Sequence, residues 1–142
     1  MLLAMDIGNT VVTMGVFDDS KLVTTLRVAT DTRRLADEYG VMVTNALILK
    51  GVTPSDIDSI CMCSVVPPLT VVFTEVCNTL FDVSPLIVSA GVRTGLPILY
   101  DNPRDVGAEI IPGDWMWWWC ARCSPATGIK ASHAEIRGCG AG

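Results

Sequence analysis

A short polar segment near the N-terminus, Asp6-Ile7-Gly8-Asn9-Thr10, lies between two apolar runs that cover residues 1–5 and 11–17. This order predicts a strand, a tight turn and a returning strand, with a carboxylate at the end of the first strand. Glycine can adopt a positive φ in such a turn, and small polar side chains beside exposed backbone N–H groups suit a phosphate group. Because a carboxylate repels phosphate, a phosphate site here requires that Asp6 hold a divalent cation, most simply Mg²⁺ through water. An ordinary hairpin turn is the alternative, since Asx-Gly turns are common.

The strands that must position this segment follow from short apolar runs in the first 110 residues. Residues 21–29 extend the opening hairpin to a third strand, and residues 59–64 and 83–89 form two more. Two helices are expected to alternate with the later strands. The whole order predicts an α/β fold with a mixed sheet, antiparallel at its start and parallel in its continuation.

The first of these helices is indicated by apolar residues that recur at helical spacing from Thr32 onward. Gly51 stands where a C-terminal cap belongs. Pro67 and Pro68 open the second helix, which runs to about Leu80, since proline suits the first turn of a helix.

Composition limits the partners of this chain. Its 142 residues allow one domain with a real core, and its net charge of -5 is opposite to what a phosphate backbone attracts. The apolar N-terminal run is too short for a membrane span and has no basic flank. We therefore expect a cytoplasmic protein that binds neither nucleic acid nor membrane.

Three cysteines, Cys61, Cys63 and Cys77, lie inside apolar segments. Thiols in such positions behave as small buried hydrophobes, and in a reducing compartment they stay reduced. We expect no disulfide at these residues.

The composition changes after Ile110. Residues 111–142 contain no Leu, Val, Phe or Tyr, and all four Trp fall within residues 115–119. Such a sequence is typical of a gene read out of frame, so we expect an aberrant or disordered tail that follows a frameshift or truncation near residues 109–111. A genuine tail that uses the Trp cluster as an anchor or interface is the alternative.

The tail also holds four residues of metal-ligating type. They are Cys120, Cys123, His133 and Cys139. The first two have the spacing of a zinc-ligand pair, but the other two form no compact second pair. We expect these residues to be accidental, with His133 a solvated residue of the tail.

Six sequence motifs occur in an order and spacing that are specific to one family. They are Asp6-Ile7-Gly8-Asn9-Thr10; Thr30-Asp31; Ala36-Asp37-Glu38-Tyr39-Gly40; Ser64-Val65-Val66-Pro67-Pro68; Gly91-Val92-Arg93-Thr94-Gly95-Leu96-Pro97-Ile98; and Tyr100-Asp101-Asn102-Pro103 with Val106-Gly107-Ala108. Together they resemble type III pantothenate kinase. The family belongs to the actin-like ATPase superfamily, in which two ribonuclease-H-like domains close on ATP. The resemblance implies that residues 1–110 form the first, ribonuclease-H-like domain, and that the second kinase domain is absent.

The same resemblance implies a reaction. Members phosphorylate pantothenate to 4'-phosphopantothenate with ATP, the first step of coenzyme A synthesis, as homodimers that need Mg²⁺ and a monovalent cation such as K⁺ or NH₄⁺. The second half of the ATP site, with the monovalent-cation site, has no counterpart in this sequence. We therefore expect a truncated form with low or no activity. A non-catalytic nucleotide- or subunit-binding module is the alternative, and another sugar-kinase-like or phosphatase member of the superfamily would explain the first motif equally well.

Residue by residue, the resemblance places the first phosphate loop at residues 6–13. The implied ligands of ATP are Asp6, Ile7, Gly8, Asn9, Thr10, Val11, Val12 and Thr13, with Asp6 also organising Mg²⁺. Val11 stands where most relatives have a polar residue. Because the cradle is mostly backbone, that difference is tolerable.

The implied pantothenate site lies near residue 110. Tyr100 would line the pocket, Gly107 and Ala108 would let the backbone approach the substrate, and Glu109 would be the catalytic base. The family pattern is Gly-Ala-Asp-Arg, so Glu109 adds a methylene and Ile110 replaces a substrate-holding cation. A carboxylate displaced by about 1 Å can lose about a hundredfold in rate. Without the resemblance, Tyr100 would be an amphipathic residue at a strand end and Glu109 a solvated acid.

Overall fold

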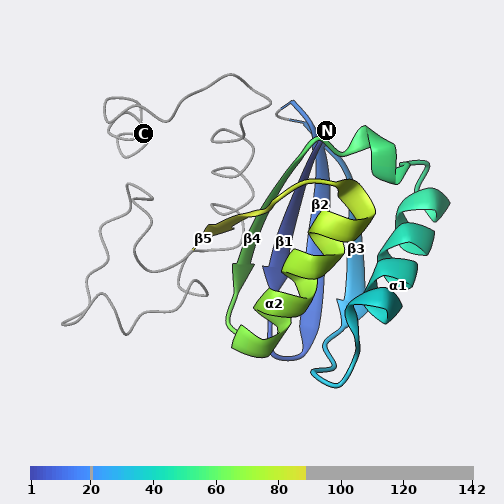
Figure 1. The fold of residues 1–142 in the computed structure, drawn as a ribbon. Coiled ribbons are helices and arrows are strands. Elements are labelled where there is room, and N and C mark those ends of the chain that lie inside the picture. The colour runs from blue at the N-terminus through green and yellow to red at the C-terminus, as the bar shows by residue number, and fades with distance from the viewer. Residues whose placement is uncertain (20, 89–142) are drawn as a thin grey trace, which may run out of the picture.

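The computed structural model describes residues 1–19 and 21–88, which form one sheet with helices packed against it (Figure 1). The strands are β1 (Leu2–Ile7), β2 (Val11–Asp18), β3 (Lys21–Ala29), β4 (Ser59–Ser64) and β5 (Leu86–Val88). The helical elements are α1 (Ala36–Leu49), a 3₁₀ turn η1 (Pro54–Asp56), α2 (Pro67–Val76) and a π-helical turn η2 (Cys77–Phe81). The tail at residues 111–142, with its Trp cluster and its four candidate zinc ligands, lies outside the described residues.

The sheet has the strand order β3-β2-β1-β4-β5. The pairs β1–β2 and β2–β3 are antiparallel, whereas β1–β4 and β4–β5 are parallel. The expected α/β fold of ribonuclease-H-like type, with an antiparallel start and a parallel continuation, is therefore confirmed.

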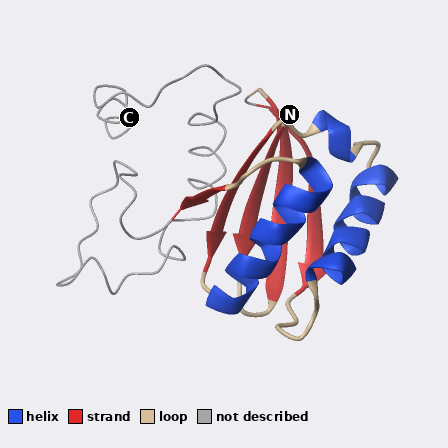
Figure 2. Ribbon diagram, viewed as in Figure 1, coloured by secondary structure: helices blue, strands red, loops and turns tan. Residues whose placement is uncertain are grey.

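Both helices cover the same face of the sheet (Figure 2). Alternate residues of β1 and β2 face them, because successive side chains of a strand point to opposite faces. The core on this side is made of buried side chains, among them Leu3, Met5, Ile7, Val12, Met14, Val16, Tyr39, Val43, Leu47, Leu69, Phe73 and Val76. The rings of Tyr39 in α1 and Phe73 in α2 join the two helices, with their centroids 4.6 Å apart and their planes tilted by 45°.

Helix α1 begins at Ala36, four residues later than the periodicity predicted. Residues 31–34 instead form a turn in which the Arg34 N–H donates to the Asp31 carbonyl at 3.2 Å. Asp31 also accepts the Arg33 N–H at 3.0 Å on its side chain, and such local side-chain bonds compete with a helix. The Glu38 carboxylate then accepts the Leu35 N–H at 2.8 Å and satisfies one free donor of the helix start.

The predicted C-terminal cap of α1 is confirmed. Gly51 has a φ of 78°, a conformation that is cheap only for glycine. Its N–H donates to the Ile48 carbonyl at 2.9 Å, and the Val52 N–H donates to the Leu47 carbonyl at 3.0 Å. These are the two hydrogen bonds of a Schellman motif.

The second helix changes character before its predicted end. Its α-helical part stops at Val76, and the π-helical turn η2 carries the chain to Phe81, close to the expected end at Leu80. Asp82 then adopts a left-handed conformation with a φ of 54°. Strand β5 follows and is shorter than the predicted strand at residues 83–89.

The three cysteines of the described residues are all buried, as expected. Neither Cys63 nor Cys77 forms a disulfide, and burial raises the pKa of the Cys77 thiol to about 12. Cys61 is disulfide-bonded. The expectation of no disulfide is therefore wrong for Cys61, because an apolar sequence context predicts burial of a cysteine and does not by itself exclude a disulfide.

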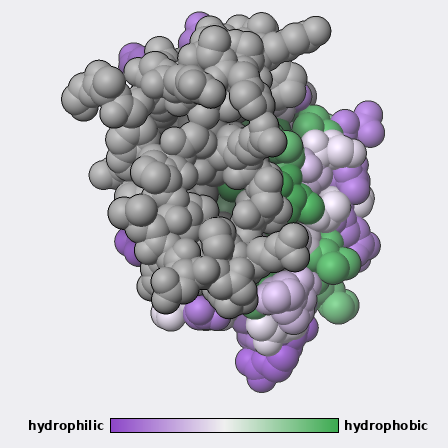
Figure 3. Space-filling model, turned by 90° about the vertical axis from the view of Figure 1, so that its left-hand side faces the viewer, coloured by the Kyte–Doolittle hydropathy of each residue, from purple (hydrophilic) through white to green (hydrophobic). Residues whose placement is uncertain are grey.

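Part of the apolar surface remains exposed. Figure 3 views the molecule from the left-hand side of Figure 1 and shows hydrophobic residues among hydrophilic ones on the described part. The large exposed hydrophobic residues are Leu22, Val23, Leu35, Val41, Ile48, Leu49, Val71, Leu86 and Ile87. Across residues 1–19 and 21–88, no helix combines the length and the apolar character that crossing a membrane requires.

Candidate functional site

The Asp6 carboxylate lies at the end of the central strand, as the sequence predicted. In the register of the sheet, Asp6 of β1 is flanked by Thr13 of β2 and by Cys63 of β4. It is half-buried, and the Cys63 thiol donates to Asp6 Oδ1 at 3.4 Å. The carboxylate is thus bonded to the neighbouring strand β4 and lies beside the loop that follows β1.

The loop at residues 8–10 joins β1 to β2 and exposes both Asn9 and Thr10. The Gly8 N–H donates to the Val11 carbonyl at 3.1 Å. Gly8 has no positive φ; the positive-φ glycine in the described chain is Gly51. Gly8 is required for space, because a Cβ on this residue would lie 2.9 Å from the Val11 carbonyl oxygen. The predicted role of Gly8 is thus corrected from backbone freedom to close approach.

Thr30, the residue after β3, holds this loop twice. Its hydroxyl donates to the Gly8 carbonyl at 2.7 Å, and its backbone N–H donates to the Thr10 carbonyl at 3.0 Å. The β4–α2 connection meets the same region, since the Val65 N–H donates to the Ile7 carbonyl at 3.1 Å. The loop and the adjoining end of β1 are therefore bonded to two parts of the chain that are distant in sequence.

Asp31, next to Thr30, forms an ion pair with Arg33. The Arg33 guanidinium donates to both oxygens of the Asp31 carboxylate, each at 3.0 Å. These hydrogen bonds lower the pKa of Asp31 to about 2, and the same carboxylate raises the pKa of Arg33. The charges of Asp31 and Arg33 therefore largely cancel beside the loop.

Of the eight residues implied as ATP ligands, three lie in the loop, and the five in β1 and β2 divide between the two faces of the sheet. Ile7 and Val12 are cross-strand partners whose side chains are fully buried in the core beneath the helices, so only their backbone groups remain for a ligand. Asp6 and Thr13 are partners on the opposite face, and Val11 is half-buried. The structure thus brings together Asp6, Thr13 and the backbone of residues 8–11.

The donor set around Asp6 fits a Mg²⁺ ion that has few protein ligands. Among residues 1–19 and 21–88, no cluster of three His, Cys, Asp or Glu could enclose a metal ion. Asp6 therefore offers a single carboxylate. Mg²⁺ is commonly held by one or two carboxylates together with waters and substrate phosphates, so the residues present fit an ion that arrives with a nucleotide.

Two residues that the sequence did not single out for a role take part in this site. In the sequence, Thr30 belongs to a motif with no assigned role, and Cys63 is expected only to be a buried thiol. The residues expected to contact the substrate lie outside the described residues; they are Tyr100, Gly107, Ala108, Glu109 and Ile110.

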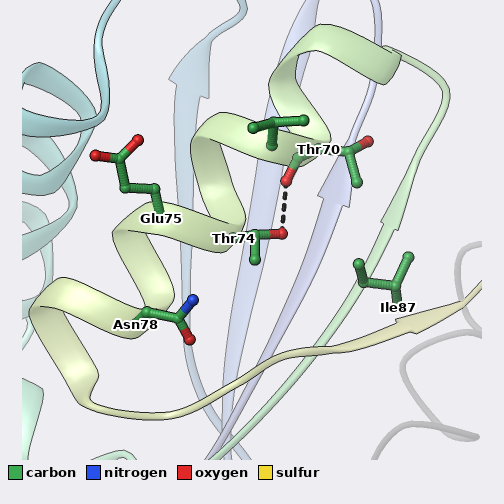
Figure 4. Close-up of a pocket in the computed structure, with 6 residues that line it drawn as sticks. Thr70, Thr74, Glu75, Asn78 and Ile87 are labelled. Carbon is green, nitrogen blue, oxygen red and sulfur yellow. Dashed lines mark hydrogen bonds between the residues drawn. The ribbon is translucent and has the colours of Figure 1, made fainter.

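A separate hollow of about 420 Å³ lies between α2 and β5 (Figure 4). It is lined by Thr70, Val71, Thr74, Glu75, Asn78 and Ile87. The Thr74 hydroxyl donates to the Thr70 carbonyl at 2.7 Å. Glu75 is the single carboxylate of this lining. The hollow includes none of the predicted site residues, and its lining has no second titratable side chain that could act with Glu75.

Comparison with known proteins gives consistent matches. The family model described as type III pantothenate kinase matches residues 2–113. The type III pantothenate kinase of Pelobacter propionicus is 43% identical over 111 residues, which are 78% of this chain and 44% of that protein. The enzyme of the same name from Myxococcus xanthus is 45% identical over 111 residues, 78% of this chain and 43% of that protein. The chain thus spans less than half the length of these relatives.

One solved structure with a related shape is a ROK hexokinase from Thermus thermophilus, with a TM-score of 0.44 and 15% identity. The match covers 63% of this chain and 35% of that chain. At this level of similarity it adds nothing about the site or its substrate.

Proposed function

The chain belongs to the type III pantothenate kinase family, and we propose that its described residues supply the phosphate-binding half of an ATP-dependent pantothenate kinase. The reaction is transfer of the terminal phosphoryl group of ATP to pantothenate, which gives 4'-phosphopantothenate for coenzyme A synthesis. The observation that carries the proposal is the Asp6 carboxylate at the end of β1, beside a loop whose carbonyls are bonded to Thr30.

In this proposal the protein mainly positions groups and balances charge, as is general in phosphoryl transfer. Asp6 would hold Mg²⁺, and the backbone N–H groups of residues 8–11 would bind phosphate oxygens. Mg²⁺, when bound, neutralises charge on the phosphates. Thr13 lies across from Asp6 and would complete the polar end of the β1–β2 hairpin. For a monovalent cation, K⁺ or NH₄⁺, we propose no ligand in this chain.

On the substrate side, we propose that Tyr100, Gly107, Ala108 and Ile110 contact pantothenate and that Glu109 accepts the proton of its hydroxyl. Glu109 carries the required charge on a longer side chain than the family aspartate. Ile110 lacks the positive charge of the family arginine. We therefore propose that turnover by this chain is slow even where nucleotide binds.

A non-catalytic module is the second candidate. The substitutions at Glu109 and Ile110 favour it. Such a module would bind nucleotide or join a homodimeric kinase of the same family in the cytoplasm.

The tail forms a separate part of the proposal. We propose that residues 111–142 are aberrant and make no contribution to the site. The composition changes at residue 110, and the family match extends to residue 113. Accurate resequencing of the codons for residues 106–119 tests this: a shifted frame that restores Gly-Ala-Asp-Arg is expected, and the absence of such a frame contradicts it.

The experiment that tests the function compares pantothenate-dependent ADP release by three forms of the chain. These are the wild type, Glu109→Ala, and the double variant Glu109→Asp with Ile110→Arg. We expect slow release by the wild type, loss in Glu109→Ala, and about a hundredfold gain when the family pair is restored. MgATP binding without ADP release in any form supports the binding module instead, and absence of both overturns the proposed function.

A further inference from the structure

We propose that Thr30 is a positioning residue of the phosphate loop, and that it sets the direction of two backbone N–H groups which bind the nucleotide phosphates. The inference rests on the proposed function. It adds a role for a residue that lies 22 positions from the loop residue to which its hydroxyl is bonded.

The first step concerns the peptide groups of the loop. Thr30 donates a hydrogen bond to two loop carbonyls. Its hydroxyl donates to the Gly8 carbonyl at 2.7 Å, and its N–H donates to the Thr10 carbonyl at 3.0 Å. All described peptide bonds are trans, so each N–H points opposite to the carbonyl of its own peptide group. The N–H groups of Asn9 and Val11 therefore point away from Thr30.

The second step concerns how the hairpin closes. The pairing of Ile7 with Val12 would suit a tight two-residue turn, in which the Gly8 carbonyl accepts the Val11 N–H. Here the Gly8 carbonyl accepts the Thr30 hydroxyl, and residues 9 and 10 form a bend without a turn hydrogen bond. The Gly8 N–H still donates to the Val11 carbonyl, so Thr30 replaces one of the two hydrogen bonds that would pair Gly8 with Val11.

The third step is that Thr30 is itself fixed. The next residue, Asp31, is bonded through both main-chain groups to the Tyr39 hydroxyl, at 2.9 and 3.0 Å. Tyr39 is fully buried and packs on Phe73. The core between the sheet and the helices therefore sets the position of the loop. Thr30 is bonded to the loop, and its neighbour Asp31 is bonded to Tyr39 of the core.

The hydroxyl is the group to test, since Thr30→Val keeps the shape of the side chain and removes the donor. Thr30→Ser is the matched control, because it keeps the donor and removes a methyl group. Two measurements on the full chain are compared: MgATP affinity by isothermal titration calorimetry, and amide hydrogen exchange without ligand at Gly8 and Thr30, whose N–H groups donate to the Val11 and Thr10 carbonyls. Thermal unfolding of each variant identifies any general loss of fold.

If Thr30 positions the loop, Thr30→Val weakens MgATP binding by about three- to tenfold, the range of one hydrogen bond, and speeds exchange at both amides. Thr30→Ser stays close to the wild type in both measurements. Wild-type affinity in Thr30→Val overturns the inference while leaving the proposed function intact. If the wild-type chain binds no MgATP, the proposed function fails; unchanged exchange in Thr30→Val then overturns the inference as well, whereas faster exchange supports the loop-holding role.

Discussion

The Tyr39 hydroxyl forms two hydrogen bonds with the main chain of Asp31: it accepts the Asp31 N–H at 2.9 Å and donates to the Asp31 carbonyl at 3.0 Å. One buried side chain of α1 thereby bonds to both backbone groups of Asp31, which lies in the segment that links β3 to α1. Backbone groups left without a partner when buried cost about as much as a lost hydrogen bond. The contact explains why a tyrosine, with its polar tip, occupies a core position.

Tyr39→Phe should destabilise the protein by about 1–3 kcal/mol, because the ring still packs on Phe73 while the Asp31 N–H loses its partner. The free energy of unfolding is measured by urea denaturation. Val43→Ala, which removes apolar volume from the same buried face of α1, is the control, and it should leave amide exchange at Asp31 unchanged. Equal stability of Tyr39→Phe and the wild type would show that the two bonds contribute nothing.

Gly8→Ala should distort the phosphate loop, since the new Cβ would meet the Val11 carbonyl oxygen at 2.9 Å. We expect a loss of about 1–3 kcal/mol in stability, as for other overpacked positions, and weaker MgATP binding. Gly40→Ala is the matched control, because a Cβ there meets nothing within 4 Å. In the interior of α1 this change should stabilise by about 0.5–1 kcal/mol. Similar effects of the two substitutions would refute the steric role of Gly8.

Stability should fall in acid through the Asp31–Arg33 pair. The pKa of Asp31 is lowered from 3.8 to about 2, so its contribution is fully present above about pH 4 and is lost as the pH falls toward 2. Asp31→Asn and Arg33→Gln should each flatten the dependence of unfolding free energy on pH in this window. The effect is small because the pair is exposed to solvent. An unaltered slope in both variants would argue against the pair.

The Cys77 thiol should resist alkylation in the folded protein. It is fully buried, and burial raises its pKa to about 12, so very little reactive thiolate exists at neutral pH. Iodoacetamide labelling at pH 8, followed by peptide mass spectrometry, should modify Cys77 at least about a hundredfold more slowly in buffer than in denaturant. Comparable rates in the two conditions would mean that η2 opens readily.

The fold could be predicted because its local signals agree. Apolar runs separated by turn residues located the strands, and Gly51 marked the end of α1 through a conformation that favours glycine. The start of α1 could not be placed, because the side chain of Asp31 bonds to residues that would otherwise begin the helix.

The site could be predicted only in part, since its loop is local in sequence and its supports are not. The contact of Thr30 with the loop depends on the β2–β3 register, which shifts at a bulge between Val16 and Phe17. Counting back from the Asp18–Lys21 pair without that bulge would place Ala29 opposite Thr10. The bond from Cys63 to Asp6 depends in the same way on the parallel pairing of β1 with β4.

The most direct test of nucleotide binding at the β1–β2 loop is a titration of the ¹⁵N-labelled chain with MgATP, followed by amide chemical shifts. We expect saturable shifts at residues 8–11 that require Mg²⁺ in the wild type. In Asp6→Asn, where no carboxylate repels the phosphates, we expect these shifts with and without Mg²⁺. Saturable shifts confined to other residues, or no shifts at this loop, would contradict the proposed phosphate site.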